Sequence, residues 1–140
     1  MSARKPTEII STTLADENHA VVSMKSDTKA YRKEPCGGCP WKTENEGMFP
    51  AEAFRISART AYDMSCNTFA CHESGTNHPA TCAGFLVKGS DNNLAVRLNF
   101  SSGVLKNDFH DGGHHLHESY RDMAEANGVD PDDPVLAPCR

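Results

Sequence analysis

The sequence predicts a small α+β domain stabilised by a metal, with two or three short helices, little sheet and a disordered N-terminal arm. Three observations lead to this fold class. Only 23 of the 140 residues are Ile, Leu, Val or Phe, which is a thin supply for a core built by apolar burial alone. Six cysteines offer another source of stability, as disulfides or metal ligands do in other small domains. Two segments repeat apolar residues at helical spacing.

Composition divides the chain into three parts. Residues 1–34 are polar and mixed in charge, and we expect a flexible N-terminal arm with one short strand over Val21–Met24. A metal-binding domain is predicted over residues 35–128 and begins at a turn rich in cysteine, glycine and proline. Residues 129–140 form an acidic, proline-rich tail.

The first predicted helix follows Phe49-Pro50, because proline is favoured in the first turn of a helix. Its apolar residues fall at positions i, i+4, i+7 and i+8, on one helical face; they are Phe54, Ala58, Ala61 and Tyr62. A short helix or turn is expected over residues 83–87, directly after Cys82.

Two further segments carry apolar patterns. Leu94, Val96 and Leu98 alternate as in a strand, but Asn92-Asn93 before them also suits a helix cap, so both interpretations stay open. The last helix has clearer spacing, again at i, i+4, i+7 and i+8; its apolar residues are Leu116, Tyr120, Met123 and Ala124. Asn127-Gly128 predicts its end.

The cysteine spacing predicts a metal centre. A Cys-x2-Cys turn lets two thiolates bind one ion, and a tetrahedral site takes two more ligands from elsewhere in the chain. Cys82 suits this role because the small residues Ala-Gly follow it and allow close approach of the backbone. The predicted ligands are Cys36, Cys39, Cys71 and Cys82, with Cys66 and His72 in reserve.

Zinc and an iron–sulfur cluster both suit four thiolates. A Cys-x2-Cys turn with two distant cysteines is typical of structural zinc. Pro40 directly after Cys39 matches the Cys-Pro step of ferredoxin ligands. Three aromatic residues near the proposed ligands would keep either centre dry; they are Trp41, Phe69 and Phe85. Cysteines without metal, reduced or in disulfides, are the remaining alternative.

Residues 35–99 resemble a family of small uncharacterised proteins of phage and actinobacterial genomes. The likeness lies in a Cys-x2-Cys-Pro-Trp turn, a Cys-His pair and a Cys-Ala-Gly step before an apolar run. These elements are residues 36–41, Cys71-His72 and residues 82–86, and the stretch 93–97 extends them. The resemblance implies the same four cysteine ligands and a phage-like setting, but no reaction.

Four histidines crowd into His110–His117. Their spacing would allow a second metal site that adds an oxygen ligand from Asp108 or Asp111. The alternative interpretation is a solvated polar loop ahead of the last helix.

The charge bears on the class of partner. The formal net charge is −5, and residues 107–140 hold eight acidic and two basic residues. Nucleic-acid binding favours a basic patch instead. No run of 18 apolar residues suggests a membrane span. The N-terminus lacks the apolar stretch of a secretory signal, so a reducing cytoplasm is expected.

We therefore expect an accessory protein of phage type that acts as a protein-interaction module, without catalysis. Acidic side chains would attract a basic protein partner; they are Glu118, Asp122, Glu125, Asp130, Asp132 and Asp133. An iron–sulfur redox or iron sensor is one alternative. The others are a metal-dependent nuclease that uses residues 108–117 and a thiol oxidoreductase that uses Cys36 and Cys39.

Overall fold

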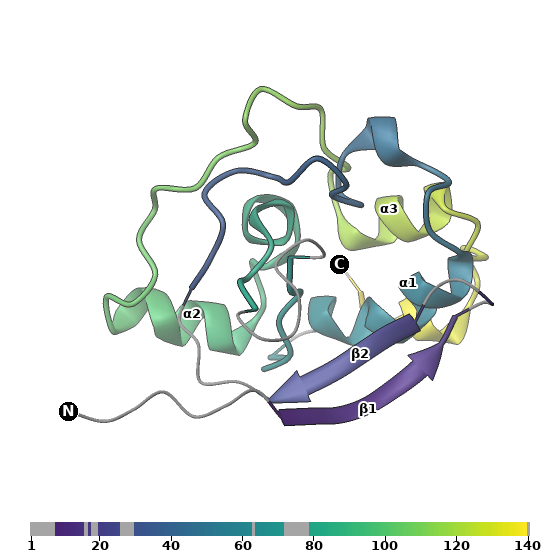
Figure 1. The fold of residues 1–140 in the computed structure, drawn as a ribbon, viewed down its shortest axis with the longest axis horizontal. Helices are drawn as coiled ribbons and strands as arrows, with labels where there is room; N and C mark the ends of the chain where they lie inside the picture. Colours follow the sequence, from purple (N-terminus) through teal and green to yellow (C-terminus); the bar gives the residue numbers. More distant parts are fainter. Residues whose placement is uncertain are drawn as a thin grey trace.

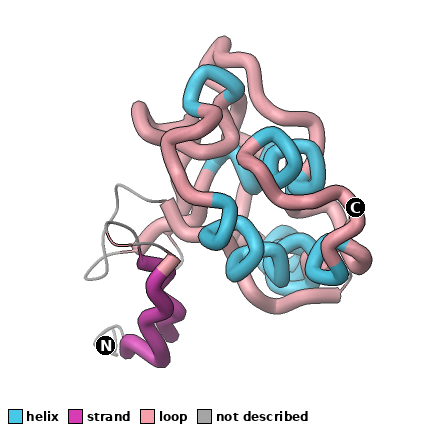
Figure 2. Tube along the Cα trace, turned by 90° about the vertical axis from the view of Figure 1, so that its right-hand side faces the viewer, coloured by secondary structure: helices cyan, strands magenta, loops and turns pink. Residues whose placement is uncertain are grey.

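The computed structural model describes residues 8–15, 17, 20–25, 30–62, 64–71 and 79–139. Over these residues the chain is a small α+β domain in which short helices and the loops between them enclose the core, as Figure 1 shows. A two-stranded hairpin lies at one side of this body in Figure 2. Within the described part of the chain, no helix is long and apolar enough to cross a membrane.

The hairpin consists of β1 (Glu8–Leu14) and β2 (Ala20–Lys25), paired antiparallel with one irregularity between Ile9 and Ser11. β2 contains the strand predicted over residues 21–24, whereas its partner β1 falls where the sequence predicts no element. Large apolar side chains of β1 are more than half exposed; they are Ile9, Ile10 and Leu14. β1 therefore contributes little to the core.

The first predicted helix is confirmed as α1 (Ala51–Ser57), followed by a 3-10 turn over Ala58–Ala61. Phe54 is buried on the predicted face. α1 packs against α3 (Tyr120–Ala126), and the buried Tyr120 hydroxyl donates to the Phe54 carbonyl at 2.6 Å. The same hydroxyl lies 2.6 Å from the Ser57 hydroxyl oxygen, so the polar end of the tyrosine is satisfied inside the core.

α3 begins later than the apolar spacing predicts. The Ser119 side chain accepts a hydrogen bond from the Asp122 N–H at 3.1 Å and caps the helix there. Leu116 therefore lies outside the helix, where it is buried and forms a β-bridge with Lys42. The predicted end is confirmed, because Asn127 is the C-cap.

Residues 94–101 form a helix, α2 (Leu94–Ser101), so the strand interpretation is wrong. Asn93 explains the outcome. Its side-chain oxygen accepts from the Val96 N–H at 3.1 Å, and its amide donates to the carbonyls of Thr60 at 3.2 Å and Asn67 at 2.7 Å. Val96 is the buried residue of α2, while Leu98 is 56 % exposed.

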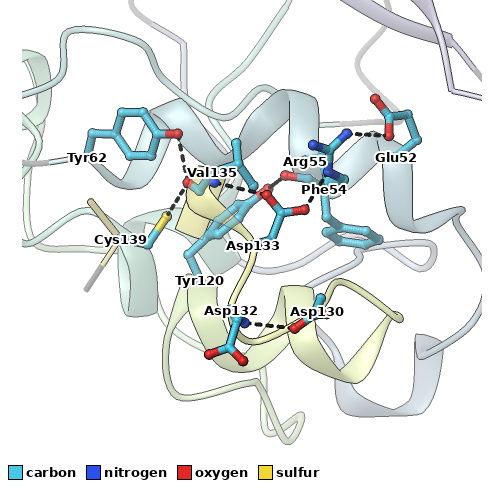
Figure 3. A network of polar contacts seen from close by, with 10 residues as sticks. All are labelled: Glu52, Phe54, Arg55, Tyr62, Tyr120, Asp130, Asp132, Asp133, Val135 and Cys139. Atoms are coloured by element: carbon cyan, nitrogen blue, oxygen red, sulfur yellow. Dashed lines mark hydrogen bonds and ion pairs between the residues drawn. The ribbon is translucent and has the colours of Figure 1, made fainter. Parts of the chain in front are cut away.

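The C-terminal segment is packed into the domain. Leu136, in a 3-10 turn over Pro134–Leu136, is fully buried. Figure 3 shows the polar contacts that fix this segment: the Tyr62 hydroxyl donates to the Val135 carbonyl at 2.7 Å, and Arg55 pairs with Asp133 at 2.7 Å. The tail expected over 129–140 therefore shares the core of the preceding domain.

Replacing Asn93 by Ala should lower the free energy of unfolding by about 2–4 kcal/mol, because the change removes a helix cap and takes the amide donor from the buried Thr60 carbonyl and the part-buried Asn67 carbonyl. Urea unfolding followed by circular dichroism measures this. Asn99→Ala, at an exposed position of α2, is the matched control and should stay within about 0.5 kcal/mol of the wild type. Equal losses for the two variants would contradict the role given to Asn93.

Candidate metal centre

The Cys-x2-Cys turn is held by its own backbone. The Cys39 N–H donates to the Cys36 carbonyl and the Lys42 N–H donates to the Cys39 carbonyl, both at 3.2 Å. The Asn45 side-chain amide also donates to the Cys39 carbonyl at 2.8 Å. A 3-10 turn over Thr43–Asn45 follows. Both cysteines are buried, Cys39 completely.

The other two predicted ligands come from a second pair of segments. Ala70 and Thr81 form an antiparallel β-bridge, flanked by hydrogen bonds from Cys71 N–H to the Ala80 carbonyl at 2.6 Å and from Cys82 N–H to the Phe69 carbonyl at 2.8 Å. Because side chains alternate between the faces of paired strands, this register assigns Cys71 and Cys82 to one face, as diagonal neighbours. Both are buried.

The two halves of the centre meet at Cys39 and Cys82, whose sulfur atoms lie 3.6 Å apart. Cys82 is 3 % exposed and Cys39 is not exposed at all. The contact joins residues 43 positions apart in the chain. None of the six cysteines forms a disulfide, so this is a close contact between two buried thiols.

The electrostatics of this pair favour one thiolate. The hydrogen bond between the two thiols lowers the pKa of the Cys39 thiol to about 7. The backbone N–H groups of Trp41 and Lys42 also lower it. The same contact with Cys39, together with burial, raises the pKa of the Cys82 thiol. Two thiols this close titrate as a unit, and a second negative charge needs a cation to balance it.

The two cysteines share a local backbone pattern. Cys39 receives backbone N–H groups two and three residues later, from Trp41 and Lys42. Cys82 receives them at the same offsets, from Gly84 and Phe85, and these lower the pKa of its thiol. Such N–H donors stabilise charge on sulfur. At Cys39 these donors add to the lowering of the pKa, whereas at Cys82 the contact with Cys39 and burial outweigh them. The thiolate is the form that binds metals.

Aromatic side chains and both cysteines belong to the same buried core cluster. Trp41 and Phe85 are fully buried, and Phe69 lies between them, with ring centres 6.1 Å from Trp41 and 6.3 Å from Phe85. Trp41 also contacts Tyr120 edge-on at 5.9 Å. The predicted aromatic residues thus form one apolar cluster beside the turn of Cys39.

Trp41 fits closely against the segment that follows Cys82. This segment is a π-helix over Phe85–Gly89, where a short helix or turn is predicted. A Cβ atom at Gly84 would lie 2.5 Å from the Trp41 Cβ, and one at Gly89 would lie 2.4 Å from the indole Cη2. Glycine at both positions therefore allows the indole to lie along the backbone.

The remaining candidates are distributed as follows. Within the described residues, no three His, Cys, Asp or Glu side chains gather closely enough to hold a metal ion. Cys36 and Cys71 are buried on the segments that carry Cys39 and Cys82. Cys66 is exposed, and His72 lies outside the described residues. The structure thus brings together two of the four predicted ligands.

The histidine segment contains one residue that the sequence does not single out. The backbone N–H of His117 donates to the Trp41 carbonyl at 2.9 Å. The His117 side chain is 5 % exposed, and its Nε2 lies 3.7 Å from the Glu46 carboxylate. This Nε2 has no hydrogen-bond partner. The other three histidines of the segment are exposed; they are His110, His114 and His115.

The comparisons with known proteins add one match. Residues 31–140 match the model of a family of unknown function, DUF6283. The chain belongs to DUF6283. The matched region includes the cysteine turn, the aromatic cluster and the packed C-terminal segment, and it leaves out the β1–β2 hairpin. A search of curated proteins and a search of solved structures each found no match.

His117 should make this DUF6283 domain sensitive to acid. Burial lowers the pKa of its imidazole, with Glu46 and Asp122 opposing this effect and His115 adding to it. The unfolded chain then binds more protons than the folded one, so stability falls as the pH drops below about 6.5, the ordinary pKa of histidine. His117→Gln should weaken the loss of stability between pH 7.5 and pH 5.5, measured by urea unfolding. His115→Gln is the control at an exposed position, and equal slopes for His117→Gln and the wild type would contradict the assignment.

Proposed function

We propose that the chain is a metal-binding accessory domain in which one ion, held by Cys36, Cys39, Cys71 and Cys82, links the cysteine turn to the segment around residue 82. The observation that carries this proposal is the 3.6 Å separation of the Cys39 and Cys82 sulfurs. Sulfurs in a disulfide are about 2.05 Å apart. Two thiolates bound to one tetrahedral zinc at about 2.3 Å each are about 3.8 Å apart. The observed separation therefore suits two ligands of a single ion.

The separation also bears on the kind of metal. In a [4Fe–4S] cluster each cysteine binds a different iron, so the cysteine sulfurs are spread around the cluster. Cys39 and Cys82 are side by side, which favours a mononuclear site, and zinc is the usual ion for four cysteines. A [2Fe–2S] cluster, in which two cysteines share one iron, is the iron alternative, and its colour distinguishes it from zinc.

The other two ligands are supported by their places in the chain. Cys36 lies in the same turn as Cys39, and Cys71 lies on the same bridged face as Cys82. Both are buried, as thiolates that bind a structural ion inside a domain would be. Binding of the ion would set their final positions, because metal binding and folding are coupled.

Protein purified without oxygen and without chelators should contain about one zinc per chain, as expected for one tetrahedral site, with no visible absorption band. Cys39→Ser and Cys82→Ser should each reduce the zinc content to near zero and lower the melting temperature. Cys66→Ser, which changes an exposed cysteine, is the matched control and should keep the zinc content and the melting temperature of the wild type. Inductively coupled plasma mass spectrometry and calorimetry measure these quantities. A folded wild type without zinc or iron would refute the metal centre.

We propose that the domain works through a basic protein partner in a reducing cytoplasm, as a phage-type accessory protein would in its host. Cysteines that form no disulfide suit a reducing compartment. Three of the six acids considered for steering are in ion pairs: Asp133 with Arg55, Glu118 with Lys88 and Glu125 with Arg121. Asp122, Asp130 and Asp132 are exposed, so they are the carboxylates that a basic surface would meet.

The double change Asp130→Asn and Asp132→Asn should weaken binding of an arginine-rich peptide several-fold at low salt and abolish most of its salt dependence. Calorimetric titration at two salt concentrations measures this. Glu125→Gln, at a carboxylate already paired with Arg121, is the control with a smaller expected effect. Equal affinity of the wild type and the double variant for the peptide would argue against this surface.

A further inference from the structure

We propose that Cys39 and Cys82 are also a redox pair, which peroxide joins in a disulfide across the centre, in preference to a Cys36–Cys39 disulfide within the Cys-x2-Cys turn. The pairing rests on the geometry of the two thiols. The accompanying loss of metal rests on the proposed function.

The geometry favours Cys82 as the partner of Cys39. Their sulfurs lie 3.6 Å apart, so a disulfide needs an approach of about 1.5 Å, within the range of small side-chain rotations. Backbone hydrogen bonds fix both residues near this position: the Cys82 N–H donates to Phe69 and the Cys82 carbonyl accepts from the Leu86 N–H at 3.1 Å. Cys39 is held by Lys42 and Asn45 at its carbonyl.

A surface groove beside the Cys-x2-Cys turn is the expected route for a small oxidant. Residues 31–37 line a surface groove whose wall includes Cys36. The groove is bounded by polar and charged side chains of Tyr31, Arg32 and Lys33. Hydrogen peroxide is little larger than water, so we expect the groove to admit it to the Cys-x2-Cys turn at Cys36, three residues before the buried Cys39.

The reaction balances with peroxide as the oxidant. The Cys39 thiolate attacks one peroxide oxygen, the O–O bond breaks, and a sulfenic acid and hydroxide form. The Cys82 sulfur then attacks the Cys39 sulfur, and the displaced hydroxide leaves as water with the Cys82 proton. The two sulfurs lose two electrons, which the peroxide gains. A bound zinc ion would be released, because two of its four thiolate ligands are consumed. Its oxidation state does not change.

The test treats the full-length wild type with hydrogen peroxide, blocks the remaining thiols and maps the disulfides under non-reducing conditions. Trypsin isolates a peptide of residues 34–42, which contains both turn cysteines, and a peptide of residues 60–88. Cleavage after Glu73 separates Cys71 from Cys82. Fragmentation of the cross-linked peptides then distinguishes Cys36 from Cys39. Zinc release is followed in parallel with a chromogenic chelator.

The expected result is loss of two thiols per chain, a Cys39–Cys82 disulfide as the first product, and release of the bound zinc in the same time. Cys66→Ser should behave like the wild type. A first disulfide between Cys36 and Cys39, or one that contains Cys71, would overturn the pairing even if zinc is bound and released. A Cys39–Cys82 disulfide in protein that never held metal would support the pairing and refute the metal centre instead.

Discussion

The packing of Trp41 along the π-helix is the constraint on which the rest of this structure depends. A π-helix bonds residues five positions apart, and Gly84 and Gly89, which are five apart, both lie against the indole. Because Trp41 follows Cys39 by two residues and Gly84 follows Cys82 by two, this one contact aligns the two turns. A side chain larger than hydrogen at either glycine would separate them, and with them the two sulfurs.

The helices were predictable where a local pattern agreed with the core. Phe54 lies on a repeated apolar face, and the structure buries that face. Leu116 continues the same kind of repeat but lies outside α3, because Ser119 caps the helix and Leu116 pairs with Lys42 instead. The alternation from residue 94 favoured a strand, yet the buried amide of Asn93 made the segment a helix. In both cases a capping side chain, and not the apolar spacing, determined where the helix begins.

For the candidate site, the sequence predicts which cysteines to consider, and the structure brings two of them, Cys39 and Cys82, into contact. Spacing associates Cys39 with Cys36, since they share a turn. The sulfur of Cys39 also contacts that of Cys82, and this contact depends on the bridge between Ala70 and Thr81 and on Trp41. These are contacts between distant segments, which no local pattern encodes. His117 was missed for the same reason: its backbone N–H bonds to the Trp41 carbonyl, a distant segment, and the other three histidines of its segment are exposed.

The long sequence separation between residues that are in contact has a consequence for folding kinetics. Cys39 meets Cys82 across 43 residues, Tyr120 meets Phe54 across 66, and Cys139 meets Ala58 across 81. Helices of seven or eight residues, as here, are marginal in isolation. Little structure can therefore form until several long loops have closed at the same time. Chains dominated by contacts between distant residues fold slowly. During that interval the cysteines are accessible, so the reducing or oxidising state of the surroundings acts on them before folding buries the pair.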